Sequence, residues 1–363
     1  MQTNQRSILF LRPEELTDVI SMKEAIDLIE LGYKEASEFP IVNAPRSRVH
    51  SRSNVRLSCF PGGIDSLGVI GSLVRAEPIK VDANNQSFVH REHPIYILWD
   101  SLTGELLSIM AGAIPDRRVG LWSTTSLMGL RTGATSGVGF RYLARKDASI
   151  AGLYGTGGQA FHKLLALQNE RKIQTYKVFS RDKAKREKFC RDAAKYVDAE
   201  LIPVDNPRDV MKNVDVVICA TNSNVPVFDG NWIEPGQHIV TVVGSNSALV
   251  RGGWLESGRR ENDDVTVQRA DVIVTNWRDS VVQEQQAGLI EPLEKGIITW
   301  DKIVELGEVI SGSGRGRKND QEITYHANNN GTAAADLAIA KWVYDRCVEL
   351  GRGTHLPLSR VGD

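Results

Sequence analysis

The chain has 363 residues, of which 41% are hydrophobic, and a formal net charge of -1, so it is long enough for two domains with separate cores. A charge so close to balance, without long basic runs, argues against nucleic acid or an anionic membrane surface as a partner and favours a small molecule. The cysteines are scattered and form no CxxC pair, which predicts reduced thiols and no metal site. Since no run approaches the roughly 20 apolar residues of a membrane span, and the N-terminal apolar run is too short for a signal peptide, we expect a cytoplasmic protein.

The first predicted elements are helical. Residues 13–39, "PEELTDVISMKEAIDLIELGYKEASEF", place apolar side chains near helical spacing, and we interpret them as two amphipathic helices with a break around Ser21. From Ala44 to about Gly112 the pattern changes to short β-like runs, among them "VRLSCF" and "PIYILWD", separated by turn residues. Because "DSLTGE" is typical of a hairpin turn, this region predicts an antiparallel or mixed sheet.

Beyond residue 148 the pattern alternates between strand and helix. The β-like runs are "SIAGLYG", "TYKVFS", "AELIPV", "DVVICAT", "HIVTVVG" and "DVIVTN", with helical stretches such as "RDKAKREKFCRDAAKYV" between the early ones. This order predicts an α/β fold of the Rossmann type, a doubly wound parallel sheet with helices on its faces. The Gly-rich segment 311–320 is interpreted as a loop or a crossing between domains, and "GTAAADLAIAKWVYDRCVEL" as a last helix with small residues that permit close packing.

A glycine motif joins the first of these strands to the first helix. In this position free backbone N–H groups and the helix dipole face a pyrophosphate. Gly155 would allow the turn, Gly157 the approach of the phosphates, and Ala160 a tight contact between helix and strand. The alternative is a tight turn without a ligand. The candidate cofactor-binding residues of the motif are Gly155, Thr156, Gly157, Gly158, Gln159 and Ala160.

The choice of dinucleotide is predicted from the end of the second strand, about 20 residues further on. Ser180 and Arg181 stand there, and a hydroxyl followed by a guanidinium can bind a 2′-phosphate that a carboxylate would repel. Asp182, one residue later, is the feature that favours NAD(H), and Arg181 could instead be a solvated charge at a helix start. We expect NADP(H), with NAD(H) as the alternative.

The segment "GLRTGATSG", residues 129–137, precedes the glycine motif by about 20 residues, and the pair is more specific than either motif alone. With "SMKEAIDLIELGYKEAS", "DSLTGELLSIM", "DVVICATNSNVPVF", "VVGSNS" and "GTAAADLAIA", it makes nearly the whole chain resemble the ornithine cyclodeaminase and mu-crystallin family. The resemblance implies a homodimer and reactions through an imine beside a nicotinamide ring. It also implies a Rossmann domain, residues 131–320, inserted in a substrate-binding and dimerisation α+β domain, residues 1–130 completed by 321–363.

Carried over from the resemblance, Arg131 would bind the substrate carboxylate and Thr132 a cofactor phosphate. A fixed guanidinium is a natural bidentate partner for a carboxylate, and the alternative for Arg131 is a salt bridge between domains. Arg46 resembles the family's second carboxylate-binding arginine, with Arg48 as its rival.

Two further cofactor contacts follow from the same resemblance. Thr221 and Ser223, after the fourth strand, fit the loop that lines the nicotinamide ribose, although strand-end capping is the equal alternative.

Two departures from the family pattern concern its lysine and its aspartate. Ser72 or Leu73 stands near the lysine position, and Asn246 stands at the aspartate position after the fifth strand. An amide is no general base near neutral pH, so Asn246 can orient a substrate or the nicotinamide carboxamide but cannot take a proton. This weakens the hypothesis of ornithine cyclodeamination.

The leading hypothesis is a dinucleotide-dependent reductase of a C=N bond, or an amine dehydrogenase in the reverse direction, acting on a small carboxylated imine or amino acid. The alternatives are redox-neutral cyclodeamination and a non-catalytic mu-crystallin-like binding protein. The polar run "YHANNNG" suggests an altered substrate pocket, unless its Asn-Gly pair only makes a turn. The catalytic candidates are Arg131, Asn246 and His326, with Lys80 as a further group near the nitrogen; the substrate-binding candidates are Arg46, Arg75, Arg131, Asn328, Asn329 and Asn330.

Overall fold

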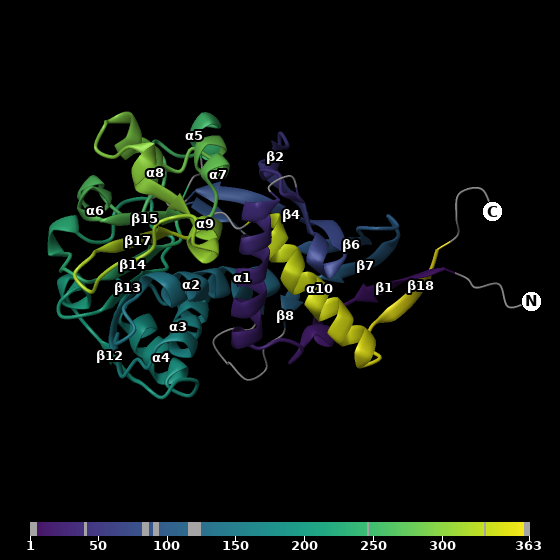
Figure 1. The fold of residues 1–363 in the computed structure, drawn as a ribbon, viewed down its shortest axis with the longest axis horizontal. Helices are drawn as coiled ribbons and strands as arrows, with labels where there is room; N and C mark the ends of the chain where they lie inside the picture. The colour runs from purple at the N-terminus through teal and green to yellow at the C-terminus, as the bar shows by residue number, and fades with distance from the viewer. Residues whose placement is uncertain are drawn as a thin grey trace, which may run out of the picture.

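The structure is a computed structural model that describes residues 6–39, 42–81, 87–89, 94–114, 125–244, 247–329 and 332–358. Two eight-stranded sheets dominate it, one mixed and one entirely parallel. Figure 1 shows the parallel sheet with its helices on the left, the mixed sheet on the right, and helices α1 and α10 near the middle. The predicted α/β fold with a Rossmann-type sheet and a second, mixed sheet is confirmed.

The mixed sheet has the strand order β18-β1-β7-β6-β4-β3-β2, with β5 paired to β4. Its only parallel pair in the described part of the chain joins β1 to β7. The predicted hairpin turn lies between β6 and β7, where the Asp100 N–H donates to the Glu105 carbonyl at 2.8 Å. The strands are β1 Ser7–Leu11, β2 Ser47–His50, β3 Val55–Ile64, β4 Val69–Val81, β5 Ser87–Val89, β6 Ile95–Asp100, β7 Leu106–Ala111 and β18 Thr354–Pro357, with a separate pair β8 Ala113–Ile114 and β9 Thr125–Ser126.

The N-terminal helical region differs in part from the prediction. Only one α-helix forms there, α1 (Met22–Glu38), and it is preceded by a single 3₁₀ turn, Pro13–Leu16. Asp18 has a φ of 60°, which stops the first turn from continuing. The break at Ser21 is where expected, because its hydroxyl accepts from the Glu24 N–H at 3.2 Å and the Glu24 carboxylate accepts from the Ser21 N–H at 2.7 Å.

The parallel sheet has the order β12-β11-β10-β13-β14-β17-β15-β16. Every residue of β13, β14, β15 and β17 is buried, as expected of strands covered by helices on both faces. The strands are β10 Ile150–Tyr154, β11 Thr175–Phe179, β12 Glu200–Pro203, β13 Val216–Cys219, β14 His238–Thr241, β15 Val272–Thr275, β16 Ile303–Glu305 and β17 Thr324–Ala327. The helices are α2 Leu127–Leu143, α3 Gly158–Glu170, α4 Lys183–Ala193, α5 Ser247–Arg251, α6 Asp264–Arg269, α7 Arg278–Gln283, α8 Ala287–Glu294 and α9 Leu306–Ser311.

Strand β17 enters the parallel sheet from the C-terminal part of the chain. It pairs with β14 on one side and with β15 on the other, after the predicted loop 311–320 has returned the chain to the middle of the sheet. Helix α10 (Ala333–Glu349) then packs on β3 and β4 of the mixed sheet. The segment after residue 320 therefore contributes to both sheets.

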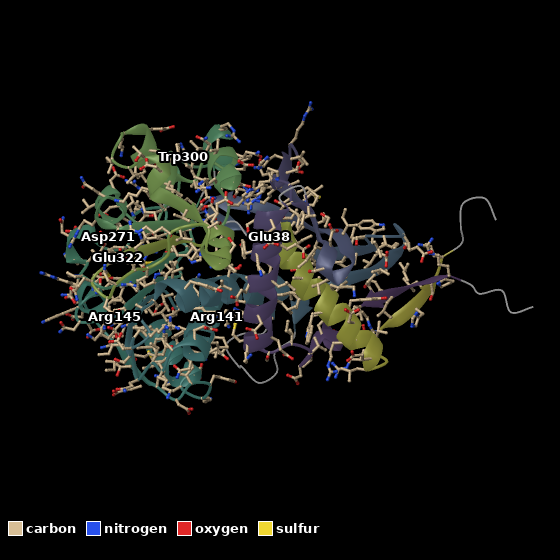
Figure 2. All side chains as sticks on the ribbon, in the orientation of Figure 1. Glu38, Arg141, Arg145, Asp271, Trp300 and Glu322 are labelled. Atoms are coloured by element: carbon tan, nitrogen blue, oxygen red, sulfur yellow. The ribbon has the colours of Figure 1, made fainter. Side chains whose placement is uncertain are left out.

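The two sheets share one continuous core. Buried apolar side chains run from β1 and β4 through α1, α2 and α10 to β10 and α3. Figure 2 labels Arg141 of α2 beside this core. Its guanidinium donates to Glu170 of α3 at 3.0 Å and to Asp27 of α1 at 2.9 Å. In the described residues no helix is long and apolar enough to cross a membrane. The same residues gather no group of three or more side chains suited to holding a metal ion.

Candidate active site

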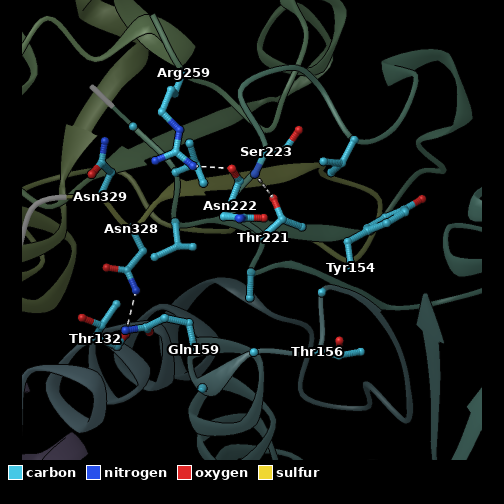
Figure 3. Close-up of a pocket in the computed structure, with 18 of the residues that line it drawn as sticks. Thr132, Tyr154, Thr156, Gln159, Thr221, Asn222, Ser223, Arg259, Asn328 and Asn329 are labelled. Carbon is cyan, nitrogen blue, oxygen red and sulfur yellow. Dashed lines mark hydrogen bonds between the residues drawn. The ribbon is translucent and has the colours of Figure 1, made fainter. Parts of the chain in front are cut away.

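A cavity of about 980 Å³ runs along the carboxyl ends of β10, β11, β13 and β14 and reaches the mixed sheet. Its walls come from the glycine turn after β10, from the loops after the neighbouring strands, and from side chains of β2, β3, β4 and α2. Figure 3 shows Thr156 and Gln159 below the cavity, with Thr221 and Asn222 above them. The carboxyl ends of parallel strands are where open α/β sheets bind ligands.

The glycine turn has the geometry of a phosphate site. Gly155 has a φ of 105°, and a Cβ at this position would lie 2.2 Å from the Ala220 carbonyl oxygen, so only glycine fits. Gly157 is different, because its φ is −94° and a Cβ there would meet nothing within 4 Å. It precedes α3 without any side-chain cap, which leaves the first N–H groups of the helix facing the cavity.

The other residues of the motif differ in whether they face the cavity. Thr156, Gly158 and Gln159 line the cavity, whereas Ala160 does not and is fully buried in the core. The residues present therefore fit a dinucleotide pyrophosphate at the N-terminus of α3.

A buried carboxylate that no sequence motif marks organises the next wall. Glu261 is fully buried, and one of its oxygens accepts from the backbone N–H and the hydroxyl of Thr221, both at 2.7 Å. The other oxygen accepts from the N–H groups of Val242 and Val243 at 2.7 and 2.9 Å. Glu261 thus joins the ends of β13 and β14, where Thr221 and Ser223 line the cavity. It lies 40 residues after Thr221, and no local motif marks that pairing.

At the end of β11, Ser180, Arg181, Asp182 and Lys185 all line the cavity. Asp182 caps α4, accepting from the Lys185 N–H at 3.0 Å, and its second oxygen lies 3.5 Å from the Lys185 ammonium group. The Ser180 hydroxyl donates to the Asp182 carbonyl at 3.0 Å. Asp182, the carboxylate that the described residues bring to this end of the cavity, is therefore engaged by its own helix.

The opposite end of the cavity is lined by five arginines, here called the arginine cluster: Arg46, Arg48, Arg56, Arg75 and Arg131. Buried carboxylates that do not line the cavity hold them in place. The carboxylate of Glu284 accepts from the Arg46 Nε at 2.5 Å and also from Arg48.

The other members of the cluster are held in the same way. Glu77 pairs with Arg56 at 2.5 Å and with Arg75 at 3.1 Å, and Asp336 of α10 pairs with the Arg131 Nε at 2.7 Å. For Arg131, burial is the largest single influence and opposes the charge, but Asp336 together with Tyr33 and Tyr96 outweighs it and raises the pKa of the guanidinium. The salt bridge considered from the sequence therefore exists, and it is compatible with substrate binding because Arg131 also lines the cavity.

The sequence model of the ornithine cyclodeaminase/mu-crystallin family matches residues 7–351. The chain belongs to this family. The resemblance predicted from "RTGATSG" and "GTGGQA" is thereby confirmed.

Relatives in the family cover nearly the whole chain. The Δ(1)-pyrroline-2-carboxylate reductase of Bacillus cereus is 27% identical over 362 residues, 96% of this chain and 99% of its own length. The solved structure of the Thermococcus litoralis Δ(1)-pyrroline-2-carboxylate reductase with NADH and L-proline has a TM-score of 0.80 and 29% identity, and covers 96% of this chain and 100% of its own. An archaeal alanine dehydrogenase dimer with bound NAD has a TM-score of 0.79 at 24% identity, over 98% and 100% of the two chains.

These relatives define a class of activity. The ornithine cyclodeaminase/mu-crystallin family contains NAD(P)-dependent reductases and dehydrogenases that act on CH–NH groups. The homologous structures hold NAD(H), so the comparisons do not favour NADP(H) over NAD(H).

Thr132 and His326 both connect to a polar network behind the cavity. The Asn328 amide donates to the Thr132 carbonyl at 2.8 Å (Figure 3) and accepts from Asn276 at 3.0 Å. The Asn276 amide oxygen in turn accepts from the His326 Nε2–H at 2.9 Å. His326 does not line the cavity; it is fully buried in β17, and burial lowers its pKa to about 3. The neutral ring thus reaches the cavity only through two amides, which differs from the direct contact expected of a catalytic group.

The same network contains a buried lysine that sequence reasoning did not single out. Lys163 of α3 is fully buried and donates to the Ser136 hydroxyl, which also accepts from the Asn328 amide at 2.7 Å. Burial lowers the pKa of Lys163 to about 7, against the opposing charge of Glu261. The helical pattern of α3 places Lys163 among apolar neighbours, and this is the sequence feature from which its burial could have been predicted.

Some predicted residues cannot be placed in the site. Asn246 and Asn330 lie outside the described residues, and the side chain of Lys80 is likewise not described. Asn329 and Asn328 line the cavity. On β4, near the family's lysine position, Arg75 brings a cation to the cavity, while Leu73 is fully buried.

Proposed function

We propose that the protein reduces the C=N bond of a small carboxylated imine with NADPH, or oxidises the corresponding amine in the reverse direction. The observation that carries the proposal is a single cavity that joins an uncapped helix N-terminus, fit for a dinucleotide, to a cluster of arginines, fit for a carboxylate. The Δ(1)-pyrroline-2-carboxylate reductases, which match nearly the whole length of this chain, support the proposal because their substrate is a cyclic imino acid.

In this proposal the residues of the glycine turn hold the pyrophosphate, and Thr221 and Ser223 contact the nicotinamide ribose. The bound dinucleotide supplies the electron pair as a hydride to the imine carbon, and the nitrogen takes one proton from solvent. Arg131 binds the carboxylate beside the C=N bond, with Arg46 as a second contact. The protein then contributes mainly by orientation, which a fixed guanidinium on a packed helix provides.

Two candidate catalytic residues take more limited roles. We assign His326 as a positioning residue that holds Asn276 and, through it, Asn328. Asn246 remains a proposed contact to substrate or to the nicotinamide carboxamide, because its amide can donate and accept hydrogen bonds but cannot act as a base.

The preference for NADP(H) rests on the end of β11. Arg181 and Lys185 bring positive charge to this part of the cavity, and Ser180 brings a hydroxyl. Asp182 would compete for the ribose diol, but its carboxylate is engaged as the cap of α4. A 2′-phosphate fits this arrangement better than a free diol does.

We further propose that the chain forms a homodimer through the mixed sheet. Val49 and Leu57 lie opposite each other on β2 and β3, and both side chains are exposed, as is Ile70 on β4. Apolar side chains left exposed on a sheet are typical of an interface, and the structurally similar archaeal alanine dehydrogenase is a dimer.

The test is a screen of the purified protein with NADPH and NADH against preformed cyclic imino acids and against α-keto acids with amines, following nicotinamide absorbance. Stoichiometric cofactor oxidation with Δ(1)-pyrroline-2-carboxylate or a similar imine is the expected result. Conversion of ornithine without net change of the cofactor would instead establish cyclodeamination. Cofactor binding without turnover of any substrate would indicate a binding protein of the mu-crystallin kind.

A further inference from the structure

Lys163 lies behind the wall of the cavity, and the proposed reaction gives it no role. It is fully buried and follows Gly158, the first residue of α3, by five residues, a rise of about 7.5 Å along the helix axis. Its amino group contacts the Ser136 hydroxyl, which accepts from the Asn328 amide at 2.7 Å. Asn328 and Thr132, joined by a hydrogen bond of 2.8 Å, both line the cavity (Figure 3). Two hydrogen bonds therefore connect Lys163 to the cavity wall.

The hydrogen bonds around Lys163 favour a neutral amine. An ammonium group has three hydrogens to donate, but within the described residues its only acceptor is the Ser136 hydroxyl. That hydroxyl already accepts from Asn328, and its own hydrogen has no other acceptor in the described part of the chain. A neutral amine has a lone pair that can accept this O–H. Since a buried donor without an acceptor is costly, the neutral form satisfies more groups than the charged form does.

No counter-ion contacts Lys163 among the residues that the structure describes. Glu261 is the carboxylate with the largest effect on it, but Glu261 already accepts four hydrogen bonds from Thr221, Val242 and Val243. Burial lowers the pKa of Lys163 to about 7, and the charge of Glu261 opposes this only in part. The amine is therefore close to the point at which a further negative charge would protonate it.

The other titratable groups near Lys163 do not change their charge near neutral pH. Burial raises the pKa of the Cys219 thiol and lowers the pKa values of His238 and His326, so all three stay neutral. Arg131 keeps its charge and acts against a proton on Lys163. These neighbours provide a constant background, against which a charged ligand would be the variable.

The proposed pyrophosphate site lies at the start of the helix that carries Lys163. Its N–H donors come from the glycine turn and from the first residues of α3, which has no side-chain cap. A bound dinucleotide brings two phosphate charges to this end of α3. Negative charge one to two helical turns away, in partly buried surroundings, stabilises the protonated form of an amine.

We propose that Lys163 is a proton-binding site linked to the dinucleotide site: its amine is neutral in the free protein and takes up one proton when the dinucleotide binds. The proton comes from solvent and adds to the Nζ lone pair, and no other bond forms or breaks. This inference rests on the part of the proposed function that places a dinucleotide at the glycine turn. Above about pH 7 binding then consumes a proton, so affinity should fall as pH rises, by up to tenfold per pH unit.

Calorimetric titration with NADPH at pH 8, in phosphate and in Tris buffer, measures the proton uptake because the two buffers differ in ionisation enthalpy. At this pH a 2′-phosphate, with a pKa of about 6, is already ionised. We expect the wild type to take up about 0.4 to 0.8 proton per NADPH, and its dissociation constant to rise about fivefold to twentyfold between pH 7 and pH 9. Binding without proton uptake at pH 8 would overturn the proposal.

Two variants assign the proton to Lys163. Lys163→Met removes the amine, and Lys163→Gln replaces it with an amide that can still donate to Ser136. Both should bind NADPH without proton uptake at pH 8. The matched control is Lys172→Met, because Lys172 is exposed just after α3 and does not line the cavity, and its proton uptake should equal that of the wild type. Wild-type proton uptake in either Lys163 variant would overturn the assignment.

The same titrations separate this inference from the proposed function. If NADPH binds with proton uptake but no imine oxidises it, the linked proton site stands and the proposed reaction is wrong. If imines are reduced but NADPH binds without proton uptake, the reaction stands and the role of Lys163 is wrong. If neither NADPH nor NADH binds, the dinucleotide site is wrong, and this inference fails with it.

Discussion

The two ends of the cavity are built in different ways. The dinucleotide end is made mostly of backbone: a glycine turn, the N-terminus of one helix, and strand ends fixed by Glu261. The substrate end is made of charged side chains from β2, β3, β4 and α2, each held by a carboxylate behind it. The first kind of site needs a local conformation, whereas the second needs segments that are far apart in the sequence to meet.

This difference predicts how each end responds to substitution. The end built from backbone groups should lose ligand binding when a substitution places a side chain in the ligand's space. It should tolerate substitutions whose side chains point away from the cavity. In a site of paired charges, the loss caused by a substitution should depend on which arginine is replaced, because each guanidinium contributes separately. Removing one guanidinium also leaves its buried carboxylate with one partner fewer. The substitutions below probe this contrast.

The largest effect is expected for Gly157→Asp. A Cβ at this position meets nothing within 4 Å and the φ of −94° suits any residue, so the variant should fold. Its carboxylate would occupy the space of the pyrophosphate with the wrong charge, and the dissociation constant of the dinucleotide should rise by about a hundredfold or more. Fluorescence titration with NADPH measures this, and Gly157→Ala is the control, with a much smaller loss. A folded Gly157→Asp protein of normal affinity would show that the turn is only structural.

The next effect concerns Arg131→Lys, which keeps the charge but loses the planar fork that Asp336 and a substrate carboxylate share. KM for the imine should rise about tenfold or more, while cofactor affinity changes far less. Thr132→Val is the contrasting variant, and it should affect the dinucleotide first. Steady-state kinetics with cofactor titration on both proteins separates the two roles. Loss of cofactor binding with normal substrate affinity in Arg131→Lys would reverse the assignments.

A third prediction uses Lys163, which lies behind the cavity in the network that also holds Thr132. Its pKa is lowered to about 7 in the folded protein, against about 10.4 in the unfolded chain. Between these values the unfolded chain binds one proton more, so a rise in pH favours the folded state. The free energy of unfolding of the wild type, relative to that of Lys163→Met, should therefore increase with pH by up to about 1.4 kcal/mol per pH unit from pH 7 to 10.

Urea denaturation of both proteins at several pH values measures this difference. Ser136 keeps a hydrogen bond from Asn328 in the variant, so the substitution leaves no hydroxyl without a partner. A difference in stability that does not depend on pH would mean that Lys163 keeps its proton in the folded state.

The smallest effect is expected for Arg181→Ala at the adenosine end. The ratio of kcat/KM for NADPH to that for NADH should fall about threefold to tenfold, since Ser180 and Lys185 remain. Arg191→Ala, which removes an exposed arginine of α4 away from the cavity, should leave the ratio unchanged. A wild-type preference for NADH would refute the role given to Ser180 and Arg181.

The sequence predicted the parts of the molecule whose cause is local. Strand and helix patterns gave the two kinds of sheet, and the glycine motif gave the turn after β10, because a φ of 105° at Gly155 admits only glycine. The break at Ser21 was predicted for the same reason, since its capping partner Glu24 is three residues away.

The parts of the site that the sequence did not predict depend on contacts between residues far apart along the chain. Glu261 binds the ends of two strands, Glu284 joins Arg46 and Arg48 from more than 230 residues away, and no periodicity encodes either contact. His326 was selected for its chemistry, but its position in a central strand buries it, and burial removes the charge that a proton donor would need.

The position of β17 also constrains how this protein can be made. During synthesis on the ribosome, β10 to β16 emerge first, and β14 and β15 must wait for residues 324–327 before they become neighbours through β17. Until then each presents an unpaired edge, the feature that makes partly folded chains prone to aggregate and slows folding when contacts are far apart in the sequence. A shortened protein that ends at residue 320 would lack the strand that joins β14 to β15. A continuous piece that keeps the whole parallel sheet therefore has to run from β10 through β17, and any expression strategy for it has to deliver the chain as far as residue 327.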